Sequence, residues 1–241
     1  MEHHIEIVES IAFSYPKNSI KKNEDAVLPA VVTRDAIFIA LADGVGGSIG
    51  GGKASNIAVL TVREEISANP DVSLREIYSK VSKNINIEAE FQSNHDMATT
   101  LVVCKITRDG VEIANVGDSR AYYALDKSLI RLTRDHTEKQ EVIDSGVFSR
   151  SELKGHFSGS RLTNSLRADR DYKLDTAEYD FSTGSIILMT DGLYNYFEGS
   201  RIIGNNGADD LLLVCSNLKK KVLKKGPNDD FSLVAVKFIR V

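Results

Sequence analysis

The sequence has no long uninterrupted apolar run. None of its apolar stretches approaches the roughly 20 residues that a membrane-spanning helix needs. The opening residues, Met1 to His4, do not resemble the charged start of a signal peptide. We therefore expect a cytoplasmic protein that does not act at a membrane.

The chain also has few cysteines and little excess of either sign of charge. The two cysteines, Cys104 and Cys215, lie in apolar segments without the spacing of metal ligands, so we expect buried free thiols in a reducing compartment. The formal net charge of −4 gives no reason to expect nucleic acid as a partner. No repeat of fixed period and no low-complexity segment interrupts the chain.

What is present is enough apolar sequence for one sizeable core. The chain has 241 residues, of which 42% are hydrophobic and 27% are charged, so we expect a single domain over residues 1–241. The run 37–42 is apolar on both alternating faces, which predicts a strand that is covered on both sides. Asp43 and Gly44 end this run abruptly, so Asp43 is expected at the end of a buried strand.

Alternating and helical hydrophobic patterns predict the remaining elements. Gly50 to Gly52 are expected to form a loop before a helix with a buried stripe at four-residue spacing, and Ser73 with Glu76 forms a capping box for a second helix. Two consecutive helices suggest a pair on one sheet. Strands are expected over 5–13, 26–32, 37–42, 100–106, 111–116, 120–125, 129–132, 172–179, 186–190 and 231–239, further helices over 138–145 and 208–222, and a polar surface segment over 149–166.

Acidic residues recur at the ends of these predicted strands. In an antiparallel sheet the end of one strand lies beside the start of its neighbour, so these side chains can meet at one edge. Each alone also fits an ordinary turn or a solvated loop, and only their joint placement suggests a site. Asp43 and Asp191 follow strands, Glu24, Asp25 and Asp229 precede strands, and Asp118 lies in a break between two strands.

Carboxylates that converge in this way repel one another and raise one another's pKa values. Divalent cations remove that repulsion, and a ligand set made only of oxygen favours Mg²⁺ or Mn²⁺ over zinc. Two ions about 3.5–4 Å apart could share Asp43 and acidify a bridging water to hydroxide. Such a site would hydrolyse a phosphate ester.

Seven segments of the chain match a known family in the same order. The chain resembles the metal-dependent PPM-type (type 2C) serine/threonine protein phosphatases in their bacterial form. The resemblance implies an α+β fold, a four-layer α-β-β-α sandwich of two antiparallel sheets flanked by helices, with residues 138–166 as a flap beside the active site. The matching segments are Asn23-Glu24-Asp25, Ala42 to Gly47, Met97 to Leu101, Gly117 to Arg120, Leu132 to His136, Thr190 to Leu193 and Asp229 to Ser232.

The resemblance also implies roles for single residues. Asp25 would orient a metal-bound water, and a hydroxide bridging two Mn²⁺ or Mg²⁺ ions would attack the phosphorus of phosphoserine or phosphothreonine. The substrate would be a phosphorylated protein, and in bacterial relatives a cognate serine/threonine kinase often opposes the enzyme. The implied ligands are Asp43, Asp191 and Asp229 for the first ion, Glu24, Asp43 and the Gly44 carbonyl for the second, and Asp118 with Asp191 for a third, weaker site.

The sequence departs from the family pattern in its expected proton donor. Many eukaryotic relatives have a histidine where this chain has Val45, so the proton for the leaving oxygen needs another source. His95, His136 and His156 are candidates by residue type only, and an ordinary surface or loop histidine is the simpler interpretation of each.

Two further departures concern the substrate phosphate and the metal site. Ile20 stands where the family often has a phosphate-binding arginine, and Lys21 and Lys22 follow it. A lysine supplies charge without the bidentate fork of arginine, and solvated loop charge is an equally good interpretation of both. Asp230 stands where asparagine is usual and adds negative charge near the site.

These departures leave alternatives to an active phosphatase. One is a phosphoprotein-binding regulatory relative with weakened catalysis, which the missing arginine and histidine would explain. Another is a structural protein that only binds cations. The complete set of predicted metal ligands favours the enzyme.

Overall fold

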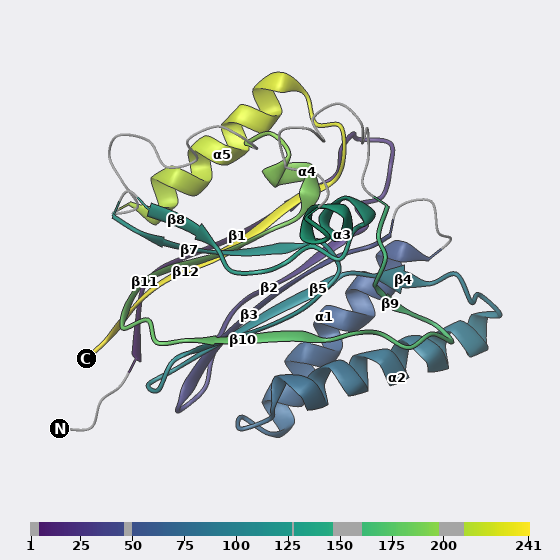
Figure 1. Cartoon of the computed structure of the whole chain (residues 1–241), viewed down its shortest axis with the longest axis horizontal. Helices are drawn as coiled ribbons and strands as arrows, with labels where there is room; N and C mark the ends of the chain where they lie inside the picture. The colour runs from purple at the N-terminus through teal and green to yellow at the C-terminus, as the bar shows by residue number, and fades with distance from the viewer. Residues whose placement is uncertain (1–4, 46–49, 127, 147–160, 198–209) are drawn as a thin grey trace.

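Two antiparallel sheets lie face to face between outer layers of helices (Figure 1). The computed structural model describes residues 5–45, 50–126, 128–146, 161–197 and 210–241. Every strand pairing in these residues is antiparallel. The architecture confirms the predicted α+β fold with four layers.

The first sheet combines both ends of the described chain. Its central strands come from the C-terminal part of the sequence, and the N-terminal strand lies at one edge beside the C-terminal strand. In spatial order its strands are β1 (Ile5–Tyr15), β12 (Phe231–Arg240), β11 (Thr183–Met189), β7 (Arg120–Leu125) and β8 (Ser128–Arg131).

The second sheet takes its strands mainly from the first half of the chain. A separate two-stranded ladder, β4 (Ala98–Thr99) with β9 (Leu166–Arg167), lies beside it. The strands of the second sheet, in spatial order, are β10 (Asp175–Tyr179), β6 (Val111–Val116), β5 (Leu101–Thr107), β3 (Ala36–Asp43) and β2 (Asp25–Val32).

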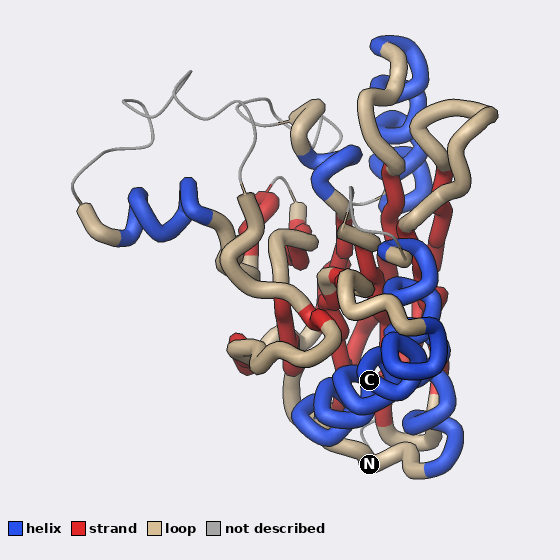
Figure 2. The backbone as a smooth tube through the Cα atoms, turned by 90° about the vertical axis from the view of Figure 1, so that its right-hand side faces the viewer, coloured by secondary structure: helices blue, strands red, loops and turns tan. Residues whose placement is uncertain are grey.

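Helices cover the outer face of each sheet. The pair α1 (Gly51–Ala68) and α2 (Leu74–Gln92) packs on the second sheet, as predicted, and α4 (Asp191–Tyr194) and α5 (Leu211–Lys225) pack on the first. The short α3 (Glu138–Asp144) stands away from the strands (Figure 2). No helix in the described ranges is both long and apolar enough to cross a membrane.

The strand β3 is buried on both faces. Ile39 and Leu41 contribute to the core between the two sheets, while Phe38 and Ala40 face the core beneath α1 and α2. All four side chains are fully buried. This confirms the interpretation of the 37–42 run and explains why Asp43, the residue that ends it, lies deep in the molecule.

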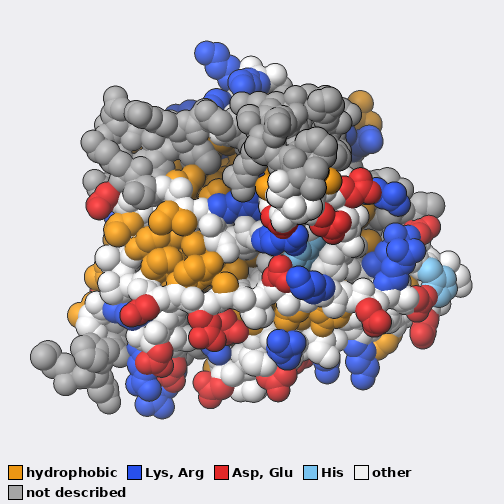
Figure 3. Space-filling view, in the orientation of Figure 1, with side chains coloured by type: hydrophobic (Ala, Val, Ile, Leu, Met, Phe, Trp, Pro, Cys, Tyr) orange, Lys and Arg blue, Asp and Glu red, His pale blue; other side chains and the backbone are white. Residues whose placement is uncertain are grey.

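Stacked aromatic rings bridge the two sheets at one edge of the sandwich. The ring of Tyr123 in β7 stacks on Phe181 with centroids 3.7 Å apart, and Tyr179 in β10 stacks on the other side at 5.1 Å. Hydrophobic side chains also form a patch between the sheets on the face shown in Figure 3. The rings close an edge that would otherwise expose the core.

Several predicted boundaries were wrong. Gly51 and Gly52 are buried residues of the first turn of α1, not loop. The strand expected from Tyr172 begins only at Asp175 as β10, and the last helix begins after its cap residue Asp210 and extends to Lys225. The capping box of α2 is present, and Cys104 and Cys215 are buried and free as expected. Residues 149–160 of the expected surface segment lie outside the described residues.

Candidate metal-dependent active site

The register of β2 and β3 brings two of the predicted carboxylates together. Asp25 at the start of β2 pairs directly with Asp43 at the end of β3. Just beyond this pair, the backbone N–H of Gly44 donates to the carbonyl oxygen of Glu24 at 3.1 Å. A side chain at Gly44 would lie 2.4 Å from the backbone of Gly51, so glycine is required for this close approach.

The first sheet supplies the opposing carboxylates. Asp191 follows β11 and Asp229 precedes β12, and these two strands are antiparallel neighbours. Asp118 lies where the chain crosses from β6 in the second sheet to β7 in the first. The strand-end argument therefore holds across both sheets, because each contributes carboxylates at the same end of the sandwich.

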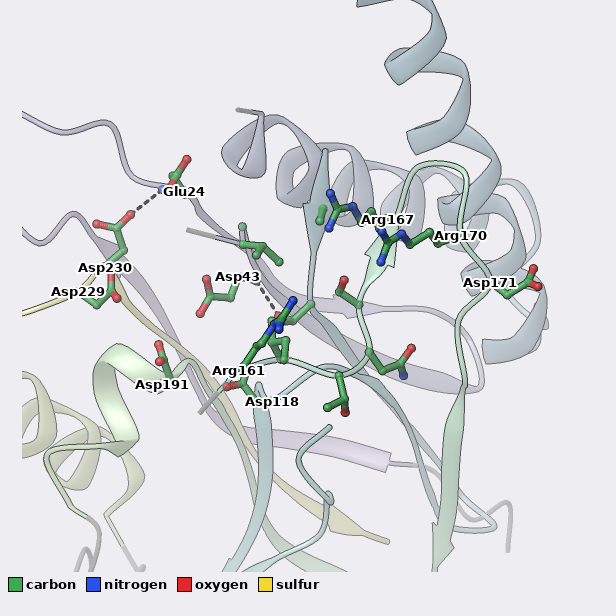
Figure 4. A pocket seen from close by; sticks show the side chains of 18 residues that line it. Glu24, Asp43, Asp118, Arg161, Arg167, Arg170, Asp171, Asp191, Asp229 and Asp230 are labelled. Carbon is green, nitrogen blue, oxygen red and sulfur yellow. Dashed lines mark hydrogen bonds between the residues drawn. The ribbon is translucent and has the colours of Figure 1, made fainter. Parts of the chain in front are cut away.

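A pocket of about 530 Å³ gathers these residues (Figure 4). Asp25 is buried beneath its wall, where it accepts hydrogen bonds on one carboxylate oxygen from Ser232 at 2.7 Å and Thr190 at 3.1 Å. The sequence-predicted residues that line the pocket are Glu24, Asp43, Gly44, Asp118, Asp191 and Asp229.

Burial and mutual repulsion raise the pKa values of Asp25, Asp43, Asp118 and Asp191. Desolvation raises the pKa of Asp43 well above its ordinary value, and the charges of Asp25 and Asp191 raise it further. Desolvation is also the main reason that the pKa is raised to about 7 for Asp25 and Asp118 and to about 6 for Asp191. Without a compensating cation, the site resists carrying its full negative charge.

The fit to a cation is partial as the side chains stand. The second carboxylate oxygen of Asp25 is buried without a hydrogen-bond partner, which leaves an acceptor for a further ligand. The donors are all oxygen atoms, as Mg²⁺ and Mn²⁺ prefer. Among the described residues, however, no three acidic, histidine or cysteine side chains are already drawn together as ligands of one ion.

Asp230 is tied to the protein backbone rather than directed at its acidic neighbours. Its two carboxylate oxygens accept the backbone N–H groups of Lys17 at 2.8 Å and Glu24 at 2.7 Å, and the second bond is drawn in Figure 4. These bonds hold the loop between β1 and β2 against the start of β12. The aspartate that replaces the usual asparagine therefore anchors this loop, a structural role that was not predicted from the sequence.

A buried ion pair supports the acidic side of the pocket and was not predicted. The guanidinium of Arg120 binds both oxygens of Asp135, with Nη2 2.7 Å from Oδ2, and stacks on the ring of Tyr194 at 3.5 Å. The Tyr194 hydroxyl reaches Asp118 at 3.5 Å. Arg120 and Asp135 both lie in the matched motifs, so motif membership was the signal that could have found them.

The histidines do not reach this pocket in the described structure. His95 is exposed and pairs with Asp169, as a surface histidine would. His136 lies in a loop, as expected, but is buried rather than at the surface: its Nδ1 accepts the backbone N–H of Gly117, and its Nε2 donates to Asp175 at 2.9 Å. His156 lies outside the described residues.

Lys21 and Lys22 are exposed, and neither is among the residues that line the pocket. Their role in phosphate binding stays a prediction without support from the geometry. The positive charges on the pocket wall are instead Arg161, Arg167 and Arg170, which the sequence analysis did not single out.

Comparison with known proteins decides the family. A sequence profile described as "Protein phosphatase 2C" matches residues 18–212. The chain belongs to the protein phosphatase 2C family. It is 33% identical over 172 residues to the serine/threonine phosphatase stp of Listeria welshimeri, with 66% of this chain and 67% of that protein covered. It is 27% identical over 188 residues to protein phosphatase PhpP of Streptococcus pneumoniae, covering 75% and 76%.

Solved structures of the family agree in fold. Stp1 from Staphylococcus aureus matches with a TM-score of 0.83 at 23% identity, covering 98% of this chain and 97% of that one. The PstP catalytic domain, solved with two manganese ions, matches with a TM-score of 0.75 at 22% identity, covering 98% and 99%. Family membership confirms the resemblance and the predicted enzyme class, a protein phosphatase.

Proposed function

We propose that this chain hydrolyses phosphoserine and phosphothreonine in proteins with the aid of two Mn²⁺ or Mg²⁺ ions. The matched proteins from Listeria welshimeri and Staphylococcus aureus are named serine/threonine phosphatases, and the PstP structure contains two manganese ions. The observation that carries the proposal is the pocket into which carboxylates from both sheets project. Divalent cations are the groups that such a buried, mutually repelling set of acids would hold.

The proposed ligands follow the strand ends. In this assignment Asp43 serves both principal ions, and Asp118 contributes to a third, weaker site. The proposed sets are Asp43, Asp191 and Asp229 for the first ion, Glu24, Asp43 and the Gly44 carbonyl for the second, and Asp118 with Asp191 for the third.

The protein would contribute positioning and charge. When bound, the ions would lower the pKa of a water between them so that it can attack phosphorus. Asp25 is fixed by Ser232 and Thr190 on one oxygen, so its unpartnered oxygen is available to orient the attacking water. Asp43 is fixed through its backbone, because Thr100 exchanges hydrogen bonds with it at 2.8 and 3.0 Å. The side chain of Val45, which lines the pocket, cannot donate a proton, so another group must protonate the leaving oxygen.

Further parts of the proposal concern the whole protein. We expect one domain over 1–241, with residues 138–166 as a flap beside the site, a cytoplasmic location, and a cognate serine/threonine kinase that adds the phosphate. Proteolysis that yields one resistant fragment of nearly full length would support the single domain.

The deciding experiment compares phosphopeptide and p-nitrophenyl phosphate hydrolysis with Mn²⁺, with Mg²⁺ and with chelator. Turnover that needs the metal supports the proposal. Tight binding of a phosphopeptide without turnover at any metal concentration would favour the weakened regulatory relative. Val45 and Ile20, which replace the usual histidine and arginine, are the reason to consider that alternative. Calorimetric Mn²⁺ binding with neither turnover nor phosphopeptide binding would favour a cation-binding structural protein.

A further inference from the structure

The pocket has two chemically different sides. In Figure 4, Asp191, Asp229 and Asp230 lie on one side, Arg167 and Arg170 lie on the other, and Arg161 reaches between them. The acidic side is where the phosphate ester would react in the proposed function. The arginine side has no part in that chemistry and needs a separate explanation. We call Arg161, Arg167 and Arg170 the basic wall.

The backbone of the basic wall is anchored at several points. The carbonyl of Arg161 accepts the N–H of Glu138 at 3.0 Å, and the neighbouring Leu162 forms a bridge with Thr137. Arg167 lies in β9, where it pairs with Ala98. The arginine side chains are therefore presented from fixed positions, which lowers the entropy lost when a ligand binds.

The charges of the wall are only partly used within the protein. Arg167 pairs with Asp96. Arg161 is 84% exposed, and its ion pair within the described ranges is at the limit of contact, 4.0 Å from Glu138. No residue in the described ranges pairs with Arg170, and the nearby Asp171 carboxylate points away from it in Figure 4. Arg161 and Arg170 are thus available to an incoming anion.

We propose that the basic wall binds a second anionic group of the substrate, so that the enzyme prefers phosphopeptides with Asp, Glu or another phosphate beside the residue to be dephosphorylated. The inference rests on the proposed function. A peptide whose phosphate lies at the carboxylates must extend out of the same pocket, and the wall lines that pocket. Arginine suits this role because its planar fork binds carboxylate and phosphate in two places at once.

The test uses three phosphothreonine peptides that differ only in their flanking residues: Asp, Ala or Lys. Hydrolysis is measured with Mn²⁺ as kcat/KM. Affinity is measured by fluorescence anisotropy with phosphonate analogues, whose C–P bond is not hydrolysed. The wild-type protein should favour the Asp-flanked peptide over the Ala-flanked one by about fivefold to tenfold, because exposed ion pairs contribute little each. This preference should weaken in high salt.

Arg161→Ala and Arg170→Ala should each reduce the preference about threefold, mainly through KM, and Arg170→Glu should shift it toward the Lys-flanked peptide. Arg34→Ala, an exposed arginine in the turn at the far end of β2, is the matched control and should keep the wild-type preference. Equal affinities for all three analogues, or a preference that survives the double alanine variant, would overturn the inference. Absence of turnover with any peptide would reject the proposed function instead, while the anisotropy still tests the wall.

Discussion

The acidic and basic sides of one pocket are built in opposite ways. The acidic side consists of residues at strand ends: Asp25 is buried, Asp43, Asp118 and Asp191 are half-buried, and Asp229 is exposed. Asp25 accepts hydrogen bonds from Ser232 and Thr190, and the Asp43 backbone exchanges hydrogen bonds with Thr100. The basic wall comes from residues 161–170, which have little regular structure besides β9, and Arg161 and Arg170 are exposed. The acidic side thus has the rigidity that chemistry requires, and the wall has the accessibility that substrate binding requires.

The two sides of the pocket also differ in what their charges cost the folded protein. Charges at Asp25, Asp43, Asp118 and Asp191 are costly to the folded protein, because burial and repulsion raise the pKa values of these carboxyls. Charges on the basic wall are solvated and cost the fold little. The carboxylates with raised pKa values imply a cationic ligand that offsets their repulsion. The exposed arginines of the basic wall repel one another little, so we expect them to affect only the choice of substrate.

The largest effect is expected for Asp43→Asn and Asp191→Asn. Removing a ligand shared by the proposed ions should lower p-nitrophenyl phosphate turnover with Mn²⁺ by more than about 100-fold, since the ions supply the attacking group. The control is Asp35→Asn, an exposed carboxylate at the opposite end of β3 that should keep wild-type activity. Wild-type rates in either site variant would refute the metal assignment.

The second prediction compares a buried arginine with one of the wall. Arg120→Ala removes the guanidinium hydrogen bonds to the buried Asp135 and should cost about 3 kcal/mol of unfolding free energy, the lower end for breaking a buried pair, because Arg131 still binds Asp135. Arg170→Ala should cost less than about 0.5 kcal/mol. Urea denaturation measures both, and similar losses would contradict the division into structural and binding arginines.

The acidic side could be predicted from the sequence, and the basic wall could not. Asp43 ends a run that is apolar on both faces, Asp191 ends another, and antiparallel pairing places strand ends beside strand starts. Both inferences need only local patterns. Arg161 and Arg170 lie in a segment with no periodicity, and their approach to the pocket depends on backbone bonds to α3 and to Asn86 of α2.

The missed details share the same cause. His136 is buried, and Asp175, which lies 39 positions later in the chain, accepts a hydrogen bond from its Nε2–H group. Gly51 and Gly52 join α1 where the helix start packs closely against backbone: a side chain at Gly51 would lie 2.9 Å from the Val45 carbonyl, and one at Gly52 would lie 3.2 Å from the Glu24 Cα. Neither of these long-range contacts changes the local hydrophobic pattern from which helices and strands are predicted. The middle of each helix or strand was therefore predicted better than its ends and the loops that follow.

Removing the metal should make stability depend on pH in a direction opposite to that of ordinary salt-bridged carboxylates. The folded-state pKa is raised to about 7 for Asp25 and Asp118 and to about 6 for Asp191, so between about pH 4 and 7 the folded state binds more protons than the unfolded state. In chelator, Tm should therefore fall as pH rises from 5 to 8.

Saturating Mn²⁺ should raise Tm most at the upper end of this range, because cations compete with protons for the same oxygens. Thermal melts at several pH values, with and without Mn²⁺, measure the effect. A metal-free protein whose Tm is flat or rises over that range would show that the acidic cluster is not strained. Arg170→Ala removes none of these carboxyls and should leave the pH profile unchanged.

A small effect should come from Asp230→Asn, which tests whether this residue belongs functionally to the acidic side. Its two oxygens accept the backbone N–H groups of Lys17 and Glu24, and asparagine has only one acceptor oxygen for the two donors. One hydrogen bond is lost, so the unfolding free energy should fall by about 1 kcal/mol. If Asp230 only anchors the loop, the Mn²⁺ concentration for half-maximal activity should change less than about twofold. Unchanged stability with a clearly altered Mn²⁺ requirement would instead place Asp230 among the groups that set the charge of the metal site.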